Sequence, residues 1–103
     1  MNPKIINTPI DGVYEIRYEP FKDNRGTFTN IFRANNPKFV NTWKEEPIKQ
    51  VNISETKLVG TIRGLHFQKS PHSEYKLITC LQGEVWDVAV DLREDSNTYG
   101  NWI

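Results

Sequence analysis

The sequence predicts an all-β protein of the sandwich or barrel type, because strand-like segments are frequent and helical periodicity is scarce. From Pro47 onward, short apolar segments follow one another closely, with Gly and Asn between them. We expect strands over residues 48–54, 59–68, 75–82 and 84–92. Only residues 36–46, a short segment bounded by prolines, are compatible with a helix.

The N-terminal part is expected to contribute two further strands. Residues 13–18 form a short strand-like segment, and residues 27–33 alternate Phe28 with polar neighbours. The segment between them, residues 19–26, is rich in turn-forming residues. This order predicts a strand, a turn and a second strand.

Residues 75–92 can be built as a β-hairpin around a two-residue turn at Gln82-Gly83. In that register Lys76 and Asp87 lie diagonally opposite on one face, with their Cα atoms roughly 7–8 Å apart. The rest of that face is mainly apolar. The other face is uniformly apolar and fits a packed interior between two sheets or a subunit interface. A charged pair in such surroundings predicts that both side chains reach each other or a shared ligand.

A second polar group lies on the predicted strand 59–68. Arg63 and His66 would point to opposite faces of a regular strand, but a bulge at Gly64 would aim both at one cavity. Histidine is the usual general base near neutral pH, and Lys or Arg stabilises an enolate or binds a phosphate. The set therefore suits removal of a proton next to a carbonyl. It does not suit a metal, because the cationic side chains repel one and a second histidine at ligand spacing is lacking.

Each of these residues also has an ordinary structural interpretation. An isolated histidine such as His66 is more often a hydrogen-bonded core residue, and a lysine such as Lys76 often protects a sheet edge. Asp87 can pair with Lys76 for structure alone, and Arg25 can be a solvated loop charge. Polar residues on a strand commonly form only the wet face of a sheet.

The composition limits the class of protein. The chain has 103 residues, with 13 Lys and Arg balanced by 13 Asp and Glu, and the length predicts a single domain over residues 1–103. Zero formal charge removes the main argument for a nucleic-acid partner or an anionic membrane surface. The lone Cys80 and the lack of an apolar leader predict a protein of the reducing cytoplasm. The apolar ending Trp102-Ile103 favours a docked strand or a chain cut inside a longer domain.

Several motifs, in order along the chain, resemble the dTDP-4-dehydrorhamnose 3,5-epimerase family. They are FKDNRGTF at residues 21–28, QVNIS at 50–54, TIRGLHFQ at 61–68, KL at 76–77, GEVWDVAVDLR at 83–93 and SNTYG at 96–100. The resemblance implies a cupin-type double-stranded β-helix, or jelly roll, of which this chain is the first half. It also implies a homodimer, a nucleotide-sugar substrate, and no cofactor or metal.

The resemblance implies roles for individual residues. His66 matches the family's catalytic base, Lys76 the lysine that stabilises the enolate at the 4-keto group, and Asp87 an acidic pocket residue. The substrate-binding positions are Arg25, Asn30, Gln50, Val51, Asn52 and Arg63. The implied reaction is epimerisation of a dTDP-4-keto-6-deoxyhexose at C3 and C5, in dTDP-L-rhamnose biosynthesis.

Two departures from the family leave alternatives open. Asn30 stands where family members carry Glu, which puts the preferred nucleotide base in question. The tyrosine that reprotonates the opposite face belongs to the family's second half, so we expect this chain alone to be inactive. One alternative is a related 3- or 5-epimerase acting on another nucleotide sugar, for example a GDP-linked one. The other is a non-catalytic remnant that binds sugar nucleotide or dimerises.

Overall fold

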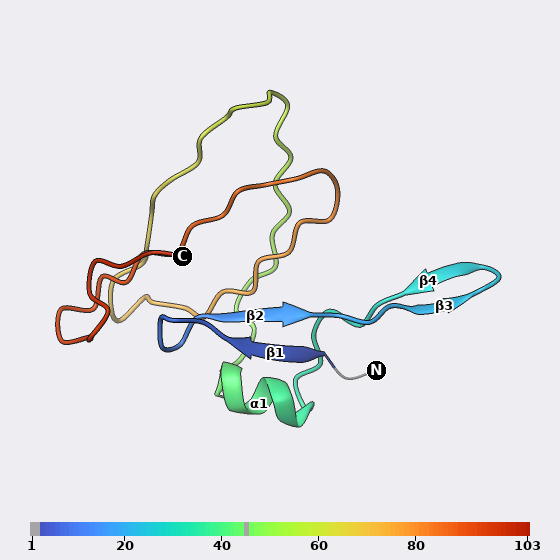
Figure 1. The fold of residues 1–103 in the computed structure, drawn as a ribbon, viewed down its shortest axis with the longest axis horizontal. Coiled ribbons are helices and arrows are strands. Elements are labelled where there is room, and N and C mark those ends of the chain that lie inside the picture. The colour runs from blue at the N-terminus through green and yellow to red at the C-terminus, as the bar shows by residue number, and fades with distance from the viewer. Residues whose placement is uncertain (1–2, 45) are drawn as a thin grey trace. The chain divides into compact units, whose positions relative to one another are not determined.

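The regular structure is mainly β, as the sequence predicts at this coarse level. The computed structural model describes residues 3–44 and 46–103. The elements in the described residues are β1 (Lys4–Asn7), β2 (Tyr14–Arg17), β3 (Phe21–Asp23), β4 (Gly26–Phe28) and α1 (Pro37–Trp43), drawn in Figure 1. Within these residues no helix has the length and apolar content that crossing a membrane requires.

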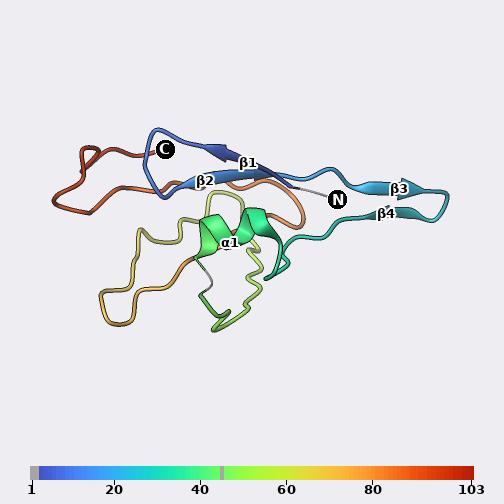
Figure 2. The same cartoon turned by 90° about the horizontal axis from the view of Figure 1, so that it is seen from below.

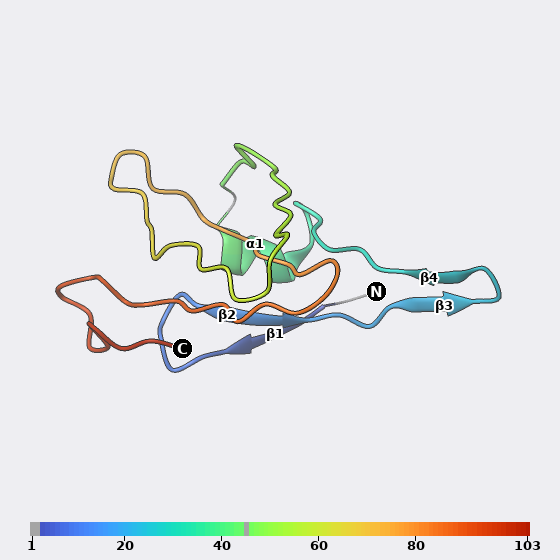
Figure 3. The same cartoon turned by 90° about the horizontal axis from the view of Figure 1, so that it is seen from above.

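The described chain divides into two compact units. One, here called the terminal unit, joins the N-terminal residues up to Lys44 with Cys80–Ile103, and the other, the central unit, is Glu46–Thr79. All five elements lie in the terminal unit. The central unit follows an irregular path, drawn without arrow or coil in green to yellow in Figure 3. Whether residues 1–103 act as one domain stays a prediction.

Strands β1 and β2 pair antiparallel, with Ile5 opposite Ile16. The turn between them is closed by Thr8, whose hydroxyl donates to the carbonyl oxygens of Val13 at 2.7 Å and Ile10 at 3.0 Å. Ile10 is buried at 3% exposure and anchors the turn. The predicted strand 13–18 is therefore confirmed as β2, and its partner β1 was not foreseen.

The helix prediction over 36–46 is confirmed for residues 37–43, and Glu45 lies outside the described residues. Asn36 caps α1, because its side-chain oxygen accepts from the backbone N–H of Lys38 at 3.0 Å. Pro37 suits the first turn, where its missing N–H costs nothing. Lys44, in the left-handed conformation, ends the helix. Figure 2 shows this short helix.

An aromatic cluster anchors α1 in the terminal unit. Phe39 is 2% exposed, and its ring centroid lies 4.9 Å from that of Phe32. Phe32 also meets Trp43 at 5.4 Å, edge to face. Phe39 and Trp43 are four residues apart and so share one face of the helix. This face, rather than helix propensity, stabilises so short a helix.

The strands predicted over 48–54, 59–68, 75–82 and 84–92 are wrong for the structure, which assigns none of them as a strand. A strand needs a hydrogen-bonded neighbour, and in the described residues the only pairing after β4 is a bridge between Val90 and Trp102. The predicted hairpin over 75–92 is consequently absent. Apolar side chains in these segments are exposed, among them Val51 at 83% and Ile62 at 88%.

The N-terminal turn prediction is also corrected. Residues 19–26 were expected to be a turn before a strand over 27–33, but a hairpin of β3 and β4 spans residues 21–28, and of the predicted strand only residues 27 and 28 are in β4. Phe21 pairs with Phe28 and Asp23 with Gly26, which leaves Asn24 and Arg25 as the two turn residues. Gly26 has a φ of +133°, a value that a side chain would oppose.

Candidate functional site

Arg25 is presented at the tip of the β3–β4 hairpin. Its guanidinium donates from Nη2 and Nε to one oxygen of Asp23, at 2.6 and 3.1 Å. The other oxygen of Asp23 accepts from the backbone N–H of Arg25 at 2.8 Å. The guanidinium holds the pKa of the Asp23 carboxyl below its usual range. The side chain of Arg25, a predicted substrate contact, is therefore held by Asp23.

Two predicted substrate contacts of the central unit bond to each other, and one of them also bonds to Glu74. Gln50 donates from its amide nitrogen to Glu74 at 3.0 Å, and Asn52 donates to the Gln50 side-chain oxygen at 3.1 Å. Glu74 is half-buried, whereas Gln50, Val51 and Asn52 are exposed. The three side chains form a polar row that can accept and donate hydrogen bonds.

Arg63 is bound to its own unit rather than to His66. Its Nε donates to the Thr56 hydroxyl at 3.1 Å, and its Nη2 donates to the Glu55 carbonyl oxygen at 3.0 Å. The sharing of one cavity by Arg63 and His66 stays a prediction. These contacts orient the guanidinium while leaving the side chain at the surface.

The imidazole of His66 folds back against Gly64. Gly64 has a φ of +96°, and a Cβ there would lie 2.9 Å from Nδ1 of His66 and 3.3 Å from its backbone nitrogen. Real Cβ atoms are not found that close to a ring nitrogen. The positive φ favours glycine at this position, and a larger residue would also have to displace the His66 ring. The bulge predicted at Gly64 is not present, because no strand forms there.

The remaining predicted residues are placed at the surface. Lys76 and Asp87 are exposed and Asn30 is half-buried. Lys76 belongs to the central unit and Asp87 to the terminal unit. The hairpin register that would bring these two side chains together is absent, so their proximity stays a prediction.

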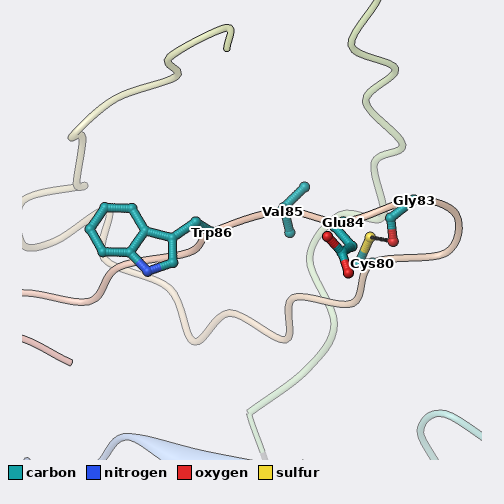
Figure 4. Close-up of a pocket in the computed structure, with 5 residues that line it drawn as sticks. All are labelled: Cys80, Gly83, Glu84, Val85 and Trp86. Carbon is teal, nitrogen blue, oxygen red and sulfur yellow. Dashed lines mark hydrogen bonds between the residues drawn. The ribbon is translucent and has the colours of Figure 1, made fainter. Parts of the chain in front are cut away.

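An open concavity lies at the turn predicted for the hairpin. Its lining residues, labelled in Figure 4, are Cys80, Gly83, Glu84, Val85 and Trp86. The Cys80 thiol lies 3.5 Å from the carbonyl oxygens of Gln82 and Gly83. The indole of Trp86 points away from Glu84 and Cys80. None of the predicted catalytic residues lines this concavity.

Asp91 organises the C-terminal loop, residues 89–103. It is 4% exposed, and its Oδ2 accepts from Ser96 at 2.6 Å and from Thr98 at 2.7 Å. Arg93 donates to both carboxylate oxygens and also to the backbone carbonyl of Asp11 at 2.8 Å. Arg93, then the two hydroxyls, hold the pKa of Asp91 far below its usual range. The loop is therefore tied to the turn between β1 and β2.

Comparison with known proteins decides the family. The family model of dTDP-4-dehydrorhamnose 3,5-epimerase matches residues 7–103. This chain belongs to the dTDP-4-dehydrorhamnose 3,5-epimerase family. The match covers every motif on which the resemblance rested.

Named relatives of the epimerase family agree with this assignment. A dTDP-4-dehydrorhamnose 3,5-epimerase of Sinorhizobium fredii is 42% identical over 88 residues, 85% of this chain and 44% of its own. The Shigella flexneri 3,5-epimerase is 37% identical and covers 96% of this chain and 54% of its own. A dTDP-4-dehydrorhamnose 3-epimerase of Streptomyces niveus is 38% identical, over 90% of this chain and 44% of its own.

The chain spans about half the length of the curated epimerases it matches. No solved structure matches it significantly. The relatives therefore show the family, while the reaction of the whole protein is a matter of proposal.

Sequence reasoning missed three carboxylates that position other groups. Asp23 stands two residues before Arg25 in a turn, a spacing at which Asp commonly accepts from the backbone, and this signal was available. Asp91 stands two residues before Arg93 in the same way. Glu74 lies 24 residues from Gln50, and no local pattern predicts that contact.

Proposed function

We propose that this chain forms part of an epimerase that inverts C3 and C5 of a dTDP-4-keto-6-deoxyhexose in dTDP-L-rhamnose biosynthesis. The observation that carries the proposal is the family match over residues 7–103, which includes His66 and Lys76. The curated relatives named for this reaction support it. Asn30 stands where family members carry Glu, so the preference for the nucleotide base is the property to measure first.

The first chemical step uses two residues. His66 removes a proton from the carbon next to the 4-keto group, and the C–H electron pair forms the enolate double bond. The carbonyl electrons move to the oxygen, where the ammonium of Lys76 stabilises the negative charge. Asp87 is proposed to lie in the same pocket. Reprotonation from the opposite face, by a donor outside these residues, inverts the centre and returns the keto group.

Substrate binding is assigned to polar side chains already oriented by neighbours. Asp23 holds Arg25, Glu74 holds Gln50, and Thr56 holds Arg63. The full proposed binding set is Arg25, Asn30, Gln50, Val51, Asn52 and Arg63. Arginine suits a diphosphate, because its planar fork donates two parallel hydrogen bonds to oxygen pairs.

We also propose that the chain is the first half of a cupin-type jelly roll that works as a homodimer in the cytoplasm. The exposed apolar segments of the central unit support this, because side chains such as Ile53 and Val59 are normally buried between sheets. Partner strands would cover them and supply the missing hydrogen bonds.

Solvent-deuterium exchange tests the proton abstraction. A dTDP-4-keto-6-deoxyhexose is incubated with the protein in D₂O, and label at C3 and C5 is followed by NMR. The chain holds the proposed base but not the donor for the opposite face, so we expect wild type to exchange label without completing the inversion. His66→Ala should reduce this exchange about 10²-fold or more, and the matched control His72→Ala should not reduce it. Exchange that is equal in wild type and His66→Ala would refute the assignment of the base.

A second candidate is epimerisation at C3 alone. The 38% identity to the Streptomyces niveus 3-epimerase favours it. The same experiment distinguishes the two reactions, because label confined to C3 supports the single-centre enzyme. Melting shifts with dTDP, CDP and GDP test the nucleotide, and a preference for GDP would overturn the rhamnose assignment. Binding without any exchange would instead support a non-catalytic module.

A further inference from the structure

The β3–β4 hairpin holds Arg25 in one orientation through a single carboxylate. Asp23 accepts from the backbone N–H, the Nε and the Nη2 of Arg25. The backbone contact fixes the turn, and the two side-chain contacts fix the plane of the guanidinium. The family comparison assigns no role to Asp23.

This ion pair is poorly placed to stabilise the fold. The Arg25 side chain is 86% exposed and that of Asp23 is 31% exposed. Exposed ion pairs contribute little to stability, because water screens them and two side chains lose freedom. The contact therefore matters more for the conformation of Arg25 than for the folding of the hairpin.

The geometry leaves the useful edge of the guanidinium available. Asp23 takes the Nε and one N–H of Nη2, and the Nη1 and Nη2 edge makes no hydrogen bond within residues 3–44 and 46–103. That edge carries two parallel N–H donors, the fork that binds a phosphate or carboxylate oxygen pair. An arginine already held by one carboxylate loses less rotamer freedom when it binds a second anion.

We propose that Asp23 is a positioning residue that pre-orients Arg25 toward the oxygens of a nucleoside diphosphate. The inference rests on the proposed function, which places Arg25 in the substrate site. The hydrogen bonds from Arg25 that hold the pKa of Asp23 below its usual range are the same contacts that orient the guanidinium.

A matched control lies on strand β2, in the other two-stranded sheet. Arg17 donates from Nε to Glu15 at 2.7 Å, with the same spacing of two residues. This pair is also exposed, and Arg17 has no assigned ligand. Glu15→Gln therefore removes a comparable surface ion pair without touching the proposed site.

The test is a double-mutant cycle on dTDP affinity, measured by calorimetry on the full chain. We expect Arg25→Ala to weaken binding strongly and Asp23→Asn to weaken it roughly three- to tenfold, since positioning acts through lost pre-organisation. In the Arg25→Ala background, Asp23→Asn should have no further effect. The Asp23→Glu variant should bind dTDP more tightly than Asp23→Asn, because it keeps a carboxylate. The Glu15→Gln variant should bind dTDP like wild type.

Two results would overturn the positioning role. One is unchanged affinity in Asp23→Asn while Arg25→Ala loses binding. The other is an equal loss from Asp23→Asn in both backgrounds, which would mean a structural effect that bypasses Arg25. Failure of the wild-type chain to bind dTDP would refute the proposed function itself, and the positioning role with it.

Discussion

The terminal and central units differ in how far their backbones form regular hydrogen-bonded elements and in how far their apolar side chains are buried. The terminal unit contains every strand and helix described and buries Ile10, Phe39 and Asp91. The central unit has no regular element and leaves Val59 and Ile62 fully or almost fully exposed. The difference is one of available partners, because hydrophobic sequence creates structure only where a second surface covers it.

The strand pairs of the terminal unit join partners that are close in sequence. Strand β1 pairs with β2 across a six-residue turn, and β3 pairs with β4 across Asn24 and Arg25. The Asp91 carboxylate accepts hydrogen bonds from Arg93, Ser96 and Thr98, all within seven residues of it. Contacts of short sequence separation cost little loop entropy. The central unit also has local hydrogen bonds, such as that of Arg63 with Thr56, but they do not pair its segments into strands.

The largest expected effect of a substitution is at the aromatic cluster of the terminal unit. Phe39→Ala should lower the free energy of unfolding by about 3 kcal/mol, since it leaves a cavity beside Phe32 and Trp43. Urea unfolding followed by circular dichroism measures this. The control is Phe21→Ala on β3, where the side chain is 59% exposed and the loss should be far smaller. Equal losses at both positions would show that Phe39 is not a core residue in solution.

A smaller but pH-dependent effect is expected at Asp91. Asp91→Asn keeps the size of the side chain but leaves Arg93 without its counter-charge, and should lower Tm on the order of 5–10 °C at neutral pH. The folded-state pKa lies below the unfolded value of about 3.9. The carboxylate therefore stabilises fully above about pH 5, and this contribution is lost as pH falls below the unfolded pKa toward the folded one.

Thermal melts between pH 7 and pH 3 check this dependence. Wild type should keep its Tm down to about pH 5 and lose Tm below that pH, and Asp91→Asn should lose less, because the titrating group is gone. Parallel curves for the two proteins would contradict the assignment of the acid sensitivity to Asp91.

Sequence patterns predicted two locally determined elements, α1 and β2, but missed β1 and the β3–β4 hairpin. Asn36 and Pro37 indicate the start of α1, because a capping side chain and a proline in the first turn are both local signals of a helix N-terminus. The alternation of residues 13–18 likewise predicted β2. Strands after Pro47 were overpredicted, because alternation indicates a surface fit for a sheet but says nothing about whether a partner strand exists.

The sequence alone nominates the residues of the candidate site, and their roles in that site stay predictions. The motifs around His66 and Lys76 identify the family without any coordinates. The orientation of Arg25 by Asp23 follows from turn chemistry and could have been read from the spacing. The contact of Gln50 with Glu74 could not, because it depends on how two distant segments meet.

The smallest effect is expected in the central unit, and it tests the comparison most directly. Val59 is 108% exposed, so Val59→Ser should change the free energy of unfolding of this chain by no more than about 0.5 kcal/mol. Urea unfolding at two protein concentrations measures it. A loss above about 1 kcal/mol that grows with concentration would mean that a second copy covers the segment in solution. A loss independent of concentration would mean that the central unit buries Val59 within one chain, and the contrast between the two units would then fail.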